Sequence, residues 1–141
     1  MAIRSLVGRV RCDGRDAETI GSDEFIHEER VVDNLLFTDQ AVNLPQRFTW
    51  GGECRVEVDM NAKLLATGDE AMEVWGECRF YEGESTSSTD LEDTQPFRFV
   101  VPKATVGSQP IVNETRLVNS EIVGQDDWAI VRFGLKNRSA D

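Results

Sequence analysis

Two neighbouring segments of this sequence alternate between apolar and polar side chains, and this period of two constrains the fold more than any other feature. In residues 54–60, CRVEVDM, every second side chain is apolar, and residues 72–81, MEVWGECRFY, repeat the pattern. Successive side chains of a β-strand point to opposite faces of the sheet, whereas a helix would need a period near 3.6. Gly68-Asp69 lies between the two segments and is a turn signal. We therefore predict an antiparallel hairpin with one buried face.

The register of this hairpin is limited by the need to place both apolar sets on the same face. A shift by one residue would turn all the apolar side chains of one strand to the other face. Pairing Ala66 with Met72 keeps the faces matched and places Met60 opposite Cys78. We take this pairing as the predicted register.

The three cysteines are predicted to be free thiols that behave as small buried hydrophobic groups. The predicted register places Cys54 opposite Glu84, several residues from Cys78, and a disulfide requires Cα atoms within about 7 Å. Cys12 completes an odd count without a CxxC pair, which does not suit a secreted disulfide framework. Arginines at positions 4, 9 and 11 interrupt any secretory signal. We expect a cytoplasmic protein.

The rest of the chain also reads as strands rather than helices. Alternating or apolar segments occur at residues 3–12, 48–50, 97–101, 111–118 and 127–136, separated by Gly, Pro, Asn and Asp. Residues 23–37, DEFIHEERVVDNLLF, carry apolar clusters that favour two short strands around Asp33-Asn34 over a helix. Many short strands at such spacing are typical of an all-β antiparallel β-sandwich or jelly roll. We predict a single domain, residues 1–141, with about seven to eight strands.

The charge of the chain bears on its partners. Its 26 Asp and Glu residues against 15 Lys and Arg residues give a formal net charge of −11. Such a field repels phosphate backbones, so nucleic acid and anionic membrane surfaces are not expected as partners. No apolar run approaches the roughly 20 residues that span a bilayer.

The sequence lacks the motifs of common enzymes. His27 is the only histidine, and in HEER the second histidine of a zinc-protease motif is replaced by Val31. There is no GxSxG, GxxxxGK[ST] or GxGxxG, so neither a nucleophile elbow nor a phosphate-binding turn is predicted. We assign no catalytic residue and predict a non-enzymatic interaction or binding module.

Acidic loops suggest calcium as a ligand of this module. Three acidic segments, residues 12–24, 82–93 and 124–127, supply the oxygen donors that Ca²⁺ prefers, and none fits an EF-hand. If the successive strands are antiparallel neighbours, residues 83–95 and 119–127 lie at the same end. Residues 81–95, YEGESTSSTDLEDTQ, are predicted to form a long solvated loop. The predicted calcium ligands are Glu82, Glu84, Asp90, Glu92, Asp93, Asp126 and Asp127.

Aromatic side chains provide the alternative binding surface. Trp75 and Tyr81 share the outer face of the predicted hairpin, and Trp128 faces outward from the last strand. Exposed aromatic rings stack on sugars or anchor protein partners. A glycan-binding module is therefore one alternative, and a self-assembling subunit with a protein partner or a second copy is another.

Overall fold

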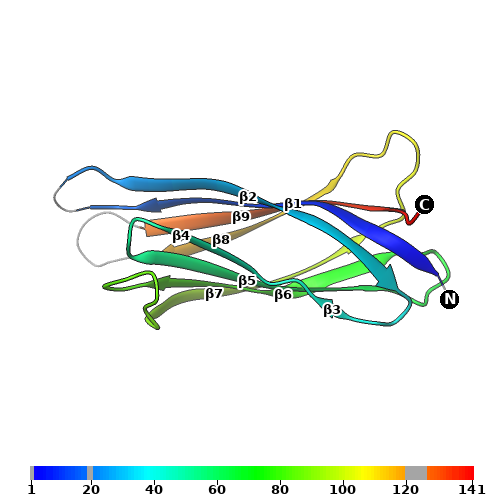
Figure 1. The fold of residues 1–141 in the computed structure, drawn as a ribbon, viewed down its shortest axis with the longest axis horizontal. Coiled ribbons are helices and arrows are strands. Elements are labelled where there is room, and N and C mark those ends of the chain that lie inside the picture. Colours follow the sequence, from blue (N-terminus) through cyan, green and yellow to red (C-terminus); the bar gives the residue numbers. More distant parts are fainter. Residues whose placement is uncertain (1, 19–20, 120–126) are drawn as a thin grey trace.

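The computed structural model describes residues 2–18, 21–119 and 127–141, which fold into two β-sheets packed face to face, without a helix (Figure 1). The described residues form nine strands: β1 (Ile3–Asp16), β2 (Glu24–Phe37), β3 (Val42–Asn43), β4 (Gln46–Trp50), β5 (Cys54–Leu64), β6 (Met72–Glu82), β7 (Leu91–Val101), β8 (Ile111–Asn119) and β9 (Asp127–Ser139). No helix in these ranges is long and apolar enough to cross a membrane.

The strand order confirms the predicted antiparallel β-sandwich. One sheet has the order β2-β1-β9-β8, and the other has the order β3-β5-β6-β7 with β4 also paired to β5. The predicted hairpin is β5 and β6, whereas the connection from β7 to β8 crosses from one sheet to the other. The ends of β6, β8 and β1 nevertheless lie together, at the end of the sandwich opposite the two termini (Figure 1).

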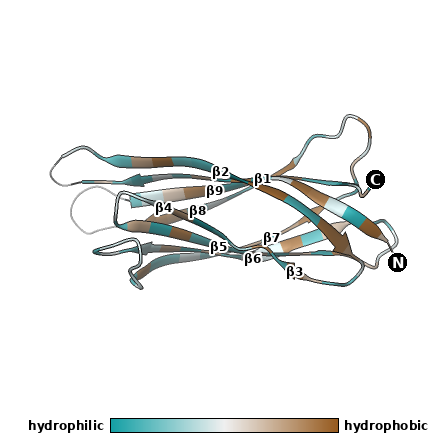
Figure 2. Cartoon of the chain, viewed as in Figure 1, coloured by the Kyte–Doolittle hydropathy of each residue, from teal (hydrophilic) through white to brown (hydrophobic). Residues whose placement is uncertain are grey.

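The core lies between the sheets and follows from the alternation in the sequence. The inward side chains of β5, β6 and β9 are buried and mostly apolar, while their neighbours on each strand face outward. Hydrophobic and hydrophilic residues alternate along the ribbons in Figure 2. Phe97 of β7 meets Phe133 of β9 with ring centroids 4.6 Å apart, which joins the two sheets near the middle of the core. All three cysteines are buried and free, as predicted.

The observed hairpin register differs from the predicted one by two residues. Met72 pairs with Leu64 rather than with Ala66, and Cys54 therefore lies opposite Glu82 rather than Glu84. The shift by an even number keeps the same faces buried, which is why alternation alone did not detect it. The turn sets the register, because Leu65 N donates to Ala71 O at 2.8 Å and this bond closes the loop.

Two further predictions of local structure are wrong. Residues 24–37 form one continuous strand, because β2 pairs with β1 along its whole length and Asp33-Asn34 stays within this ladder. The predicted loop over residues 81–95 is shorter, since β7 already begins at Leu91 and pairs with β6. The Gly51-Gly52 pair forms the turn between the antiparallel strands β4 and β5.

Near the termini, the sandwich holds a buried charge that is fully partnered. Arg4 donates to Asn137 Oδ1 at 2.5 Å and lies 3.1 Å from the Glu70 carboxylate. Asn137 is fully buried and donates to the carbonyl oxygens of Glu70 and Val101 at 2.7 and 3.1 Å. Buried charges and amides of this kind are tolerated because each has its hydrogen-bond partners.

We expect Asn137→Ala to lower the free energy of unfolding by about 1–3 kcal/mol, because it leaves the Arg4 guanidinium and the carbonyls of Glu70 and Val101 with one partner fewer. Urea denaturation checks this, with Lys136→Ala on the outward face of the same strand as the control. Equal stability of the two variants would contradict it.

Candidate cation site at one end of the sandwich

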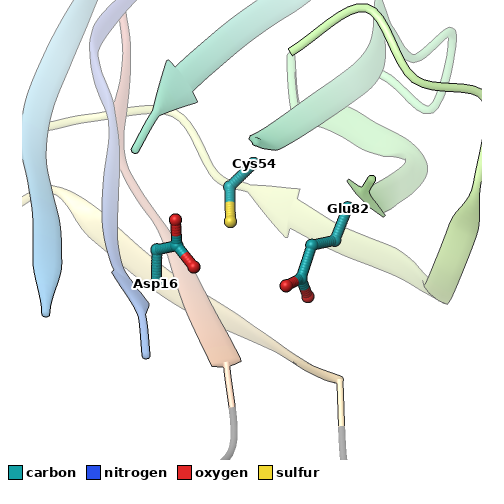
Figure 3. Close-up of side chains that lie close together, drawn as sticks. All are labelled: Asp16, Cys54 and Glu82. Atoms are coloured by element: carbon teal, nitrogen blue, oxygen red, sulfur yellow. The ribbon is translucent and has the colours of Figure 1, made fainter. Parts of the chain in front are cut away.

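At the end of the sandwich opposite the termini, inward positions that are apolar in mid-strand become carboxylates. Asp16 ends β1, Glu82 ends β6 and Asp127 begins β9, and each occupies the inward face of its strand. Cys54 begins β5 and is paired with Glu82 across the hairpin. The side chains of Asp16, Cys54 and Glu82 converge from different strands (Figure 3). Both sheets thus contribute acidic groups to one buried cluster.

Two overlapping groups of donor atoms share Asp16. One donor each from Asp16, Cys54 and Glu82 lie within 4.8 Å of one another, and the same holds for Asp16, Glu18 and Glu24. The first group is deep, since Asp16 and Cys54 are buried, whereas Glu18 and Glu24 of the second are more exposed. We call them the inner group and the outer group.

Asp16 carries a buried oxygen without a partner. The residue is only 1 % exposed, and among the described residues nothing donates a hydrogen bond to its Oδ2 atom. The β4–β5 turn lies directly against this oxygen, because a Cβ added to Gly51 would be 2.3 Å from it. A buried carboxylate oxygen that lacks a donor is costly, and native structures seldom keep one without a reason.

The surroundings of Asp16 oppose its ionisation. Burial, followed by the negative charges of Asp127 and Glu18, raises the pKa of Asp16 to about 7. Burial also raises the pKa of Glu82, as does its hydrogen bond with Asp127. Both effects disfavour the charged form of a carboxyl group. A bound cation would reverse them by placing positive charge among these oxygens.

No basic side chain of the described chain forms an ion pair with Asp16, Glu82 or Asp127. Residues 19–20 and 120–126, which adjoin this end in sequence, contain no Lys, Arg or His. The nearby Arg15 faces outward on β1 and forms an ion pair with Asp23 at 2.8 Å. This end of the sandwich differs from the end that holds Arg4. There every buried charge meets an opposite charge or a dipole, whereas the charged groups of the cluster are all negative.

Hydrogen bonds hold two of these carboxylates in place. Asp127 Oδ1 accepts from Ala17 N at 2.6 Å, just beyond the end of β1. The Asn119 side-chain amide donates to Glu82 Oε2, which links β8 to β6 across the two sheets. Such contacts orient carboxylates in the way that outer hydrogen bonds orient metal ligands.

Cys54 is the one cysteine that adjoins carboxylates of this cluster. It is fully buried, and its burial and the Asp16 charge raise the pKa of its thiol. Cys78 lies deeper in the core, four residues before Glu82 on the same strand, where Thr115 forms a hydrogen bond with it. Cys12 also lies in the apolar core.

The predicted calcium ligands do not all meet at one place. Glu82 and Asp127 meet in the cluster, whereas Glu84 and Asp90 lie exposed in the connection between β6 and β7. Asp93 on β7 serves another purpose, because its Oδ2 accepts from Val118 N of β8 at 3.0 Å and so joins the two sheets. Glu92 is exposed on β7, and Asp126 lies outside the described residues.

The sequence prediction assigned neither Asp16 nor Cys54 to the site. From the sequence, Asp16 belongs to an acidic segment and Cys54 to a buried apolar face. The parity of the strands contained the missing signal: Asp16 continues the inward series of Cys12 and Gly14, and Glu82 continues that of Cys78 and Phe80. A carboxylate in register with a buried face is the pattern that identifies such a site.

The aromatic residues of the glycan alternative do not share one surface. Trp75 and Tyr81 lie on the outer face of β6, and Trp128 lies on the outer face of β9 in the other sheet. The Arg55 guanidinium lies 4.1 Å from the centroid of the Tyr81 ring and covers it. Trp75 borders a hollow of about 280 Å³ lined by Gly76, Pro96, Phe97 and Arg98.

Comparison of the chain with protein-family models, with curated proteins and with solved structures gives no match. What is inferred about its function therefore depends on the chemistry of the cluster itself.

Proposed function

We propose that this protein is a non-enzymatic β-sandwich module that binds a divalent cation between the strand ends formed by Asp16, Glu82 and Asp127. The cation would join the two sheets at this end, because its ligands come from strands of both. Calcium is the first candidate for an ion held by the outer group, which shares Asp16 with these strand ends.

The observation that carries this proposal is the buried, unpartnered Oδ2 atom of Asp16. A structural carboxylate at this depth would normally be paired with a basic group or replaced by an apolar side chain. Asp16 instead faces other carboxylates, whose charges disfavour its ionisation. A divalent cation supplies the missing positive charge and uses the free oxygen as a ligand.

The outer group suits calcium. Asp16, Glu18 and Glu24 provide only carboxylate oxygens, and Ca²⁺ takes six to eight hard oxygen donors from carboxylates, carbonyls and water. Glu18 and Glu24 are accessible enough for water to complete the coordination shell.

A protein partner or a second copy of the chain is part of the proposal. Exposed apolar side chains lie along the β1–β2 hairpin, with Phe25 at 53 %, Val31 at 70 % and Leu35 at 50 % exposure. All three lie at outward positions of β2, and exposed apolar side chains on an outer face favour contact with another protein. Three free, buried cysteines agree with a cytoplasmic location.

Thermal unfolding in millimolar Ca²⁺, against excess EDTA, tests cation binding. An ion at about 100 times its dissociation constant stabilises the folded state by about 2.7 kcal/mol, so we expect the melting temperature to rise by several degrees. Asp16→Asn should abolish the rise, because it removes the ligand that both groups share. The matched control is Asp13→Asn on the same strand, where the carboxylate is paired with Arg11 at 2.8 Å and the response to the ion should persist. Unchanged melting of the wild-type protein with Ca²⁺, Mg²⁺ and Zn²⁺ would contradict the proposal.

A further inference from the structure

We infer that the inner group is a site for a thiophilic divalent ion of the zinc class, with Cys54 as a sulfur ligand beside Asp16, Glu82 and Asp127. This inference rests on the proposed cation binding and specifies which ion the deeper group selects. It differs from a calcium site in its donor atoms, because Ca²⁺ takes oxygen ligands and gains little from sulfur.

The positions of the donors suit a small tetrahedral ion. Ligands of tetrahedral Zn²⁺, bound at about 2.0–2.3 Å, lie about 3.3–3.8 Å from one another. The Asp16, Cys54 and Glu82 donors already lie within 4.8 Å of one another, so small side-chain rotations bring them to that spacing. In Figure 3 the three side chains converge on one region between their strands.

A fourth ligand is present in the same cluster. Asp127 is 3 % exposed and hydrogen-bonds with Glu82, so its carboxylate adjoins the inner group. Ala17 N and the Asn119 amide already hold Asp127 and Glu82 by one oxygen each. These bonds orient the carboxylates without a basic side chain that would compete with an ion.

Cys54 gives the inner group its selectivity. Carboxylates alone bind hard ions such as Ca²⁺ and Mg²⁺, whereas a thiolate favours Zn²⁺ and related metals. The thiol coordinates as the thiolate, so its proton passes to the buffer when the ion binds. Cys54 can belong to this group because the register of the β5–β6 hairpin places it directly opposite Glu82.

Cobalt(II) provides the direct probe, since it replaces Zn²⁺ in such sites and its bond to a thiolate absorbs in the near ultraviolet. We expect wild-type protein titrated with Co²⁺ to develop this charge-transfer band, and Zn²⁺ to abolish it by displacement. Cys54→Ser should lose the band. It should also weaken Zn²⁺ binding by about 100-fold or more, because losing a residue that only hydrogen-bonds to a metal ligand already weakens binding by about 10- to 100-fold. Cys78→Ser is the matched control, because that buried thiol lies outside the cluster and its hydrogen bond with Thr115 suits a hydroxyl equally well.

The outcomes separate this inference from the proposed function. A Co²⁺ band that depends on Cys54 and not on Cys78 supports a sulfur-ligated site. Melting that responds to Ca²⁺, together with the absence of a band in the wild-type protein, would overturn the inference and leave the proposed function standing. No response to any of the ions would overturn both. If Cys54→Ser does not fold, the absence of the band in the wild-type protein still overturns the inference, and a band that persists in both Cys12→Ser and Cys78→Ser supports it.

Discussion

Asp16→Asn is expected to stabilise the metal-free protein at pH 8, although it removes the central residue of the proposed site. The pKa of Asp16 is raised from 3.8 to about 7 in the folded state, mainly by burial. Because one pKa unit is worth about 1.4 kcal/mol, ionised Asp16 costs the folded state about 4 kcal/mol. Asparagine has the same shape without the charge, so the melting temperature in EDTA should rise by roughly 10 °C.

The gain in stability from Asp16→Asn should grow as the pH rises. Asp16 ionises near pH 3.8 in the unfolded chain but near pH 7 in the folded one, so wild-type stability falls as the pH rises from about 4 to about 8. The advantage of Asp16→Asn is therefore absent at pH 4 and complete at pH 8. Melting temperatures in EDTA across this range measure it.

Asp13→Asn is the control for this prediction, and its effect should have the opposite sign. The pKa of Asp13 is lowered, first by its hydrogen bonds from Arg11, so the native state favours its charge. Replacing it should destabilise the protein slightly at pH 8, and this loss should disappear at low pH. A gain for Asp16→Asn that is equal at pH 4 and pH 8 would contradict the electrostatic account of the cluster. Stabilisation on loss of a residue is the usual sign of a site that is maintained for function.

Gly76→Ala is expected to destabilise the protein by at least about 3 kcal/mol. Gly76 lies in the middle of β6, opposite Met60 of β5, with a φ of +154° that side chains rarely adopt. A Cβ at this position would lie 1.8 Å from the backbone oxygen of Asp59 and 3.1 Å from the Phe97 ring. The backbone oxygen cannot move without separating two central strands of the sheet, so the strain has no inexpensive relief.

Gly134→Ala on β9 is the matched control, because a Cβ there meets no atom within 4 Å among the described residues. We expect it to change the free energy of unfolding by less than about 1 kcal/mol. Urea denaturation of both variants gives the comparison. Similar unfolding midpoints for the two would show that the close approach of β5 and β6 at Gly76 is not a constraint on the fold.

Much of the fold followed from local patterns. Period-two alternation in β5, β6 and β9 predicted antiparallel strands and the buried face of each, and the parity of Cys54 and Cys78 was right even though their register was not. Alternation fixes only whether a residue faces inward, so a shift of two residues is invisible to it. Hydrogen bonds within the Leu65–Ala71 turn decided between the registers.

The candidate site was predictable only in part. The arrival of acidic segments at one end followed from the direction of successive strands, and Glu82 and Asp127 were assigned to it from the sequence. Glu84 and Asp90 were assigned for their charge alone, but they extend into the exposed connection after β6. Asp16 and Cys54 needed the structure, because strand parity marks them as inward-facing but does not show that their strand ends meet.

The sequence by itself determined the class of fold, the inward and outward faces of the strands, and the excess of negative charge. These are properties of neighbouring residues, and the period of a strand records them directly. Only the tertiary structure decided which strand ends meet. Asp16, Cys54, Glu82 and Asp127 are far apart in the chain and come together because two sheets pack face to face. The same packing buries Asp16 with one carboxylate oxygen that has no hydrogen-bond partner among the described residues.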